Sequence, residues 1–114
     1  MSALRERLDI LFTTNTITPS AMSLCEATIL KFINQDNEKR YTKLITHLAM
    51  AVTRIEREEE LIAPPEDIME EIRESSHFSE AVENVKWIQS QMSTMLPNEE
   101  RQYLIMHFVN ASHL

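Results

Sequence analysis

The 114-residue sequence contains no glycine, and this absence narrows the choice of fold. Tight β-hairpin turns need residues with positive φ, and glycine adopts such angles at the lowest cost. A protein built mainly from hairpins is therefore disfavoured. Helices joined by loops that contain asparagine and proline are the better interpretation, because asparagine is the next best residue for left-handed backbone.

Cysteine and long apolar runs are scarce as well. The single Cys25 excludes a disulfide framework and a CxxC metal site, and we expect it to be a small buried hydrophobe rather than a reactive thiol. No run reaches the roughly 18 apolar residues of a membrane span. Glu6 and Asp9 interrupt the N-terminal segment, so we expect no signal peptide and a cytoplasmic location.

Basic residues are the minority, with 11 against 18 acidic ones and a net charge of −7. The segment from Glu56 to Glu74 holds nine acids and two bases, which accounts for the whole imbalance. No basic stripe exists to bind a phosphate backbone, and this argues against direct nucleic-acid binding. The acidic segment itself is either a solvated helix end and loop or a docking surface for a basic partner.

The apolar residues that are present predict helices. With 43% hydrophobic and 25% charged residues, the chain resembles a globular domain, and its length suits one domain. In the first half, spacings of three and four residues predict three helices: one of about 11 residues, one opened by Thr18-Pro19, and one from about 40 to 59. The inward positions are Leu4, Leu8, Leu11 and Phe12, then Met22, Cys25, Ile29, Phe32 and Ile33, then Tyr41, Leu44, Leu48, Ala51, Val52 and Ile55. The second helix should end within the polar stretch 34–37.

The second half predicts three more helices after the break at Pro64-Pro65. Acidic residues 66 and 67 suit the start of a short helix, and Pro97 suits the start of the last one, with Glu99 and Glu100 in its first turn. The inward positions are Ile68 and Ile72, then Phe78, Ala81, Val85, Ile88, Met92 and Met95, then Leu104, Phe108 and Ala111. The sequence therefore predicts an all-α fold, a compact bundle of about five to six helices.

Two histidines lie at the margins of these apolar stripes. At 100° per residue, His47 lies about 60° from Leu44 and on the same edge as Arg54. His107 lies about 60° from Leu104, alongside Tyr103 and Glu100. Such a position predicts a partly buried ring with one nitrogen open to chemistry, although the pattern alone also allows a satisfied structural histidine.

The residues around these histidines resemble a known family. HLAMAVTR, with an arginine seven residues after its histidine, resembles the first signature of the PTS regulation domain, or PRD. EERQYLIMH resembles the second, in which a glutamate stands seven residues and an aromatic residue four before the histidine. HFSEAVENVKWIQ is similar to an intervening family helix and LPNEE to the start of its last helix. RLDILFTTNTI resembles the lead-in of free-standing, single-PRD members.

The resemblance implies an all-helical regulatory module, usually a homodimer, with a lead-in helix at 1–16 and a PRD core at 17–114. In this family two histidines accept phosphate from the histidine phosphocarrier protein or from enzyme II components of the sugar phosphotransferase system. By motif position these correspond to His47 and His107, with Arg54, Glu100 and Tyr103 as supporting residues. His77 and His113 match neither signature. The resemblance implies that the protein has no enzyme activity and no cofactor. It also implies that the phosphorylation signal reaches transcription or another protein through a separate effector protein.

Two other interpretations compete with this one. The first is a helical adaptor in which both histidines are structural. The second is a metal enzyme that uses Glu100, His47 and His107. Carboxylate-bridged metal sites in helical bundles repeat a Glu-x-x-His pair, and this sequence has one such pair, ending at His77. The metal interpretation is therefore the weaker of the two.

Overall fold

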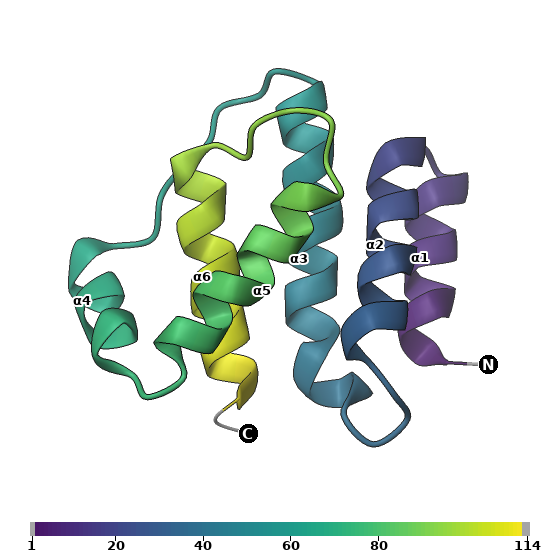
Figure 1. Ribbon diagram of the computed structural model, residues 1–114. Coiled ribbons are helices and arrows are strands. Elements are labelled where there is room, and N and C mark those ends of the chain that lie inside the picture. The colour runs from purple at the N-terminus through teal and green to yellow at the C-terminus, as the bar shows by residue number, and fades with distance from the viewer. Residues whose placement is uncertain (1, 113–114) are drawn as a thin grey trace. The chain divides into compact units, whose positions relative to one another are not determined.

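The computed structural model describes residues 2–112 and places six helices and no strand among them (Figure 1). The predicted all-α class is thereby confirmed. The helices are α1 (Ala3–Thr13), α2 (Pro19–Phe32), α3 (Glu38–Glu56), α4 (Glu66–Glu74), α5 (Phe78–Ser90) and α6 (Asn98–Ser112). They group into two compact units, the first up to Glu59 and the second from Glu60 onward. We call them the N-terminal and C-terminal units.

The N-terminal unit consists of α1, α2 and α3, which run alternately up and down and pack against one another (Figure 1). Ser2 caps α1 by accepting a hydrogen bond from the Arg5 backbone N–H at 3.1 Å. Thr18 caps α2 in the same way through the Ala21 N–H, and proline occupies the first turn, as predicted. The core of this unit contains Leu4, Leu8, Ile17, Ala21, Leu24, Cys25, Ile29, Leu44, Ile45, Leu48, Ala49, Ala51 and Val52.

Asparagine performs the turn chemistry that glycine would otherwise supply. Asn15 adopts φ 60° after α1, the left-handed region predicted for an asparagine in this chain. After α2, the Asn34 side chain accepts hydrogen bonds from the N–H groups of Asp36 and Asn37, and the Asn37 amide donates to the Phe32 carbonyl at 3.0 Å. Helix α2 therefore ends at Phe32, two residues before the polar stretch 34–37 in which its end was predicted, and the asparagines of that stretch cap it.

The start of α2 is attached to the end of α3. The Thr18 N–H donates to the hydroxyl of buried Thr53 at 3.2 Å, and the Thr18 hydroxyl donates to Glu56 Oε1 at 2.7 Å. The Ser20 hydroxyl donates to the same carboxylate oxygen. These bonds hold the two helix ends together and use polar groups that helix termini leave without intrahelical partners.

Helix α3 ends at Glu56, three residues before the predicted boundary. Glu58 adopts φ 55°, and the N–H groups of Glu58 and Glu59 return to the carbonyls of Ile55 and Arg54. This is a left-handed helix stop of the kind that usually carries glycine. The sequence pattern does not reveal this stop, because the residue in the left-handed conformation is Glu58 rather than glycine. The predicted helix therefore extends three residues too far at its end.

We expect the Glu58→Gly variant to be more stable than the wild type. A non-glycine residue in the left-handed region costs about 1 kcal/mol or more, and glycine removes most of that cost. Urea denaturation should show a gain of about 1 kcal/mol. Glu58→Ala is the matched control, because it removes the same charge but keeps Cβ. An equal gain in both variants would assign the effect to charge rather than to backbone conformation.

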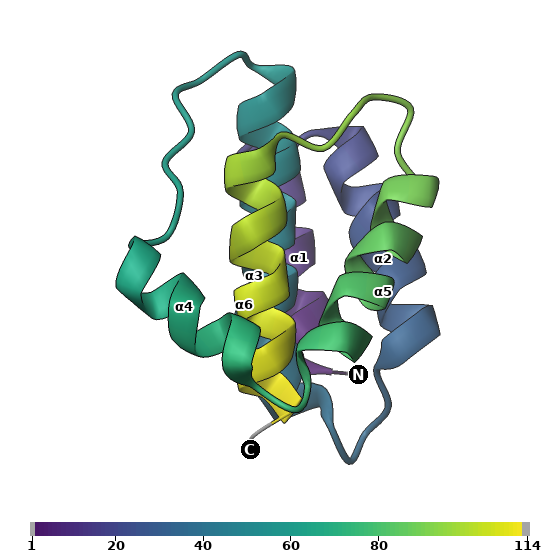
Figure 2. The ribbon, with the colours of Figure 1, turned by 60° about the vertical axis from the view of Figure 1, so that its left-hand side comes forward.

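The C-terminal unit consists of α4, α5 and α6, and α6 lies between the other two helices in both views (Figures 1 and 2). Helix α5 crosses α6, and the loop 91–97 leads the chain back to the start of α6. The core of this unit contains Met69, Ile72, Ala81, Val85, Ile88, Leu96, Leu104, Ile105, Phe108, Val109 and Ala111. The inward positions predicted for the last helix are confirmed.

Three residues predicted to be inward are exposed instead. Phe12 is 40% exposed, because α1 buries the side that carries Leu4 and Leu8. Ile68 is also 40% exposed, because α4 turns Met69 rather than Ile68 toward the core together with Ile72. Met95 is 77% exposed, because α5 ends at Ser90 and the predicted stripe does not continue through the loop.

Cys25 is buried, as predicted. Its thiol contacts the Ile45 carbonyl oxygen at 3.7 Å, and none of its surface is exposed. Burial raises the pKa of the Cys25 thiol from 9.0 to about 12, and the neighbouring Glu26 carboxylate acts in the same direction. A thiol without thiolate character is a poor nucleophile, so Cys25 is a core residue in this protein.

We expect Cys25 to resist iodoacetamide at pH 8 in the native protein and to react fully in urea, as measured by intact mass.

The raised pKa of Cys25 in the folded protein also makes stability depend on pH. Its stabilising contribution is complete below the unfolded-state pKa of about 9 and is lost as pH rises toward 12. The stability of the wild type should therefore fall over that range more than that of Cys25→Ala. Rapid native alkylation would contradict the assignment.

Candidate functional site

His47 lies on α3 at the edge of its buried face. Its ring is half-buried, whereas Leu44 and Leu48 on either side are at most 1% exposed. The partial burial predicted from the stripe margin is confirmed. A ring in this position is held by the core on one side and remains accessible to another molecule on the other.

A row of cations lies along the same side of α3. Arg40, Lys43 and Arg54 are each within about 40° of His47 around the helix axis. Lys43 is one turn before the histidine, about 6 Å along the axis, and Arg40 and Arg54 are about 10 Å away in opposite directions. Lys43 and Arg40 are exposed and Arg54 is half-buried. The sequence prediction included Arg54 but omitted the other two, although their helical spacing from His47 was visible. The prediction that the chain has no basic stripe overlooked this short row.

His107 lies at the equivalent margin on α6. It is half-buried between Leu104 and Phe108, which are at most 1% exposed. Tyr103, one turn earlier, is half-buried and lies within about 40° of His107 around the axis. The residues of the second signature therefore share one side of α6, as those of the first share one side of α3.

Glu100 completes this side of α6 and is only 1% exposed, which the sequence prediction missed. A buried carboxylate needs compensation, and its place in the first turn of α6 puts it at the positive end of the helix dipole. Among the described residues, no buried side-chain nitrogen or oxygen lacks a hydrogen-bond partner. Glu100 is therefore an integrated part of the helix start, about 10 Å along the axis from His107.

The remaining histidines lie in different settings. His77 is the residue immediately before α5, and its backbone N–H donates to the Ser75 hydroxyl at 3.1 Å. His113 lies outside the described residues. Within either unit, no group of three or more His, Cys, Asp or Glu side chains among the described residues is arranged to hold a metal ion. None of the helices in residues 2–112 is long and apolar enough to cross a membrane.

Comparison with known proteins gives one match. No curated protein and no solved structure is significantly similar to this chain. A sequence profile described as the PRD domain matches residues 20–111, which include His47, Arg54, Glu100, Tyr103 and His107. The match runs through both units and covers most of the chain. The chain therefore belongs to the PRD domain family, whose members are regulatory domains of the phosphotransferase-system type.

Proposed function

We propose that this protein is a phosphorylation-responsive regulatory module that accepts phosphate on His47 and His107. The donor is the histidine phosphocarrier protein or an enzyme II component, and the signal passes to a separate effector protein. We further propose that residues 1–114 act as one PRD, that the protein is a cytoplasmic homodimer, and that it is neither an enzyme nor a direct ligand of nucleic acid. The principal support is that each histidine of the two family signatures is half-buried at the edge of a core helix face.

The chemistry of the transfer suits such a histidine. Histidine side chains ordinarily have a pKa near 6.5, so many are neutral in the cytoplasm and can act as nucleophiles. A ring nitrogen of the acceptor attacks the phosphorus atom of a phosphohistidine donor. The new N–P bond forms as the donor N–P bond breaks, and the donor nitrogen keeps that electron pair. The acceptor then loses the proton from its other ring nitrogen, and the donor ring takes up one proton, so that it leaves as a neutral imidazole. Core packing on one side of the ring orients it without blocking the donor.

The two sites differ in their electrostatic surroundings, and this difference gives them different roles. A phosphoryl group adds about two negative charges. At His47 these charges arrive within a row of cations, Arg40, Lys43 and Arg54, which favours the phosphorylated form. At His107 they arrive on the side of α6 that already carries Glu100. Phosphate at His47 should therefore strengthen local packing, and phosphate at His107 should loosen it.

Arg54→Ala should weaken the effect of phosphate at His47 more than it weakens folding. Arg54 is half-buried at the stripe margin, and its guanidinium is suited to pair with a phosphoryl group. We expect a drop in phosphorylated His47 of about tenfold, equivalent to one charge-assisted contact of ~1.4 kcal/mol, with labelling of His107 unchanged. Lys43→Ala should act in the same direction, and Lys39→Ala is the matched control on α3. Outright unfolding of Arg54→Ala would instead make Arg54 a structural residue.

Phosphate uptake tests the proposed function. The purified protein is incubated with the phosphorylated histidine phosphocarrier protein, and acid-labile phosphate on the chain is measured against time. A regulatory PRD should take up phosphate that is stable in alkali and lost in acid. An adaptor with structural histidines should take up none from this donor or from enzyme II components. That result would contradict the proposal.

A further inference from the structure

The C-terminal unit contains an apolar cavity of about 240 Å³ that the two histidines do not use. It lies between α5, the loop 91–97 and the start of α6, and we call it the α5–α6 cavity. Val82 and Val85 contribute its α5 side, Ile105 its α6 side and Met95 its loop side. Arg101 and Ile105 lie about 120° and 160° from His107 around the α6 axis, so the cavity opens away from the phosphate-accepting side.

The wall of this cavity is held in place by one side chain. The Gln89 amide donates to the Thr94 carbonyl at 2.9 Å and accepts from the Leu96 N–H at 2.5 Å. These two bonds attach the loop to the last turn of α5 and bury Leu96, whereas the neighbouring Met95 is 77% exposed beside the cavity. The cavity is thus preformed on one side and bordered by an adaptable thioether on the other.

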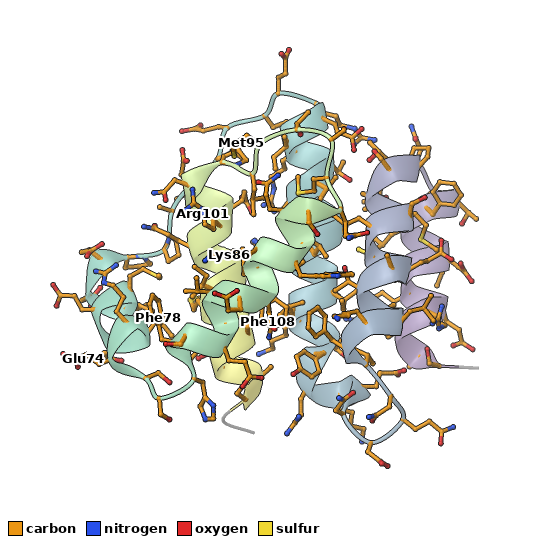
Figure 3. The ribbon with its side chains drawn as sticks, in the orientation of Figure 1. Glu74, Phe78, Lys86, Met95, Arg101 and Phe108 are labelled. Atoms are coloured by element: carbon orange, nitrogen blue, oxygen red, sulfur yellow. The ribbon has the colours of Figure 1, made fainter. Side chains whose placement is uncertain are left out.

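The charges at the cavity contrast with those of the rest of the unit. From Glu60 onward the chain has ten acidic and three basic residues, a net charge of −7. Two of the three basic residues, Lys86 and Arg101, line the cavity, and both are exposed (Figure 3). The third, Arg73, pairs with Glu66. Lys86 contacts Glu83 at 3.3 Å in an exposed pair that is easily exchanged. The cavity therefore suits an apolar side chain that has a carboxylate next to it, since the carboxylate could pair with Lys86 or Arg101.

The connecting segment of this chain presents such a pair. Residues 59–65 contain no helix, and Glu60 and Ile62 are both exposed, Ile62 by 69%. The intervening Leu61 and the following Ala63 are half-buried. The exposure of residues 60–62 therefore alternates, with the two exposed side chains two residues apart. Glu60 and Ile62 thus form one outward carboxylate beside one outward aliphatic side chain.

We propose that the connecting segment of one copy docks on the α5–α6 cavity of a second copy, with Ile62 in the apolar cavity and Glu60 beside Lys86 and Arg101. The cavity is smaller than the 300 Å³ or more of common ligand pockets and suits a single side chain. A two-fold dimer forms this contact twice, because each copy has both the segment and the cavity. The inference rests on the homodimer of the proposed function and identifies its interface.

This interface is tested by measuring the dimer dissociation constant of the full chain by sedimentation, for the wild type and for variants that reverse one or both charges of the proposed ion pair. Glu60→Lys, Ile62→Ser and Arg101→Glu should each raise the dimer dissociation constant by about tenfold or more, since each removes part of one central anchor. The combined Glu60→Lys and Arg101→Glu chain should recover most of the affinity, because the pair is restored with reversed charges. Leu30→Ser and Glu70→Lys are matched controls at exposed positions elsewhere and should leave the constant unchanged.

Each alternative outcome is informative. A wild-type monomer at tens of micromolar would overturn this interface and the proposed homodimer together, while phosphate uptake would still test the phosphorylation sites separately. A dimer that none of the three variants weakens would overturn the interface alone. Variants that lower thermal stability without changing sedimentation would assign these residues to contacts within one chain, which also contradicts the proposal. Glu60→Lys changes no helix, so its result does not depend on folding.

Discussion

Alanine at both His47 and His107 should abolish acid-labile phosphate labelling while most of the helicity is retained. Phosphotransfer requires a neutral, accessible ring nitrogen, and these two half-buried histidines occupy the signature positions of the PRD match. Neither ring is among the fully buried side chains, so truncation should cost each helix little packing. The measurement is alkali-stable, acid-labile label per chain, with circular dichroism of the same samples.

Single variants and a control divide this result between the two sites. His47→Ala and His107→Ala should each remove part of the label, and the cation row beside His47 predicts that His47→Ala removes the larger part. His77→Ala should keep full labelling, because His77 lies at the start of α5 and outside both signatures. Full labelling of the double variant, with the phosphate on His77 or His113, would overturn the assignment.

Phe108→Ala should destabilise the protein by about 3–5 kcal/mol, a large share of the ~5–15 kcal/mol by which domains are usually stable. Phe108 is 1% exposed on α6, and its loss removes buried apolar surface and leaves a cavity in the C-terminal unit. Urea denaturation should show the loss as a lower midpoint with an unchanged slope.

A conservative variant separates packing from phosphate acceptance. Phe108→Leu should lose much less stability than Phe108→Ala, because leucine fills most of the same space. His107 directly precedes Phe108 on α6, and its ring lies at the margin of the buried face, so correctly folded Phe108→Leu should still accept phosphate at His107. Equal destabilisation by alanine and leucine would indicate that the shape of the aromatic ring, rather than buried volume, holds α6.

Several elements of the fold were predictable because local chemistry decides them. Thr18 and Pro19 form a helix start that needs no tertiary contact, and the asparagines of 34–37 end α2 through their own side chains. The inward set Leu104, Phe108 and Ala111 follows directly from helical spacing. Both signature histidines likewise lie at the margins that their spacing predicts.

Other features depend on tertiary structure and were missed for that reason. Glu58 occupies a left-handed stop that local sequence assigns to glycine or asparagine. Met95 fits the apolar spacing of α5 but lies beyond the end of that helix at Ser90. The helix ends there because the following loop is attached to the Gln89 side chain. Glu100 was predicted in the first turn of the last helix, beside His107, but its spacing did not reveal that it is buried. The α5–α6 cavity arises from residues on two helices and a loop, and no spacing along one helix reveals it.

Localising the phosphate by peptide mass spectrometry under alkaline conditions tests the central claim most directly. The wild-type chain is phosphorylated by the histidine phosphocarrier protein or by an enzyme II component and digested without acid. We predict phosphohistidine at His47 and His107, with His47 the more heavily occupied, and unmodified His77 and His113. Phosphate on His77 or His113, or no phosphohistidine with either type of donor, would contradict it.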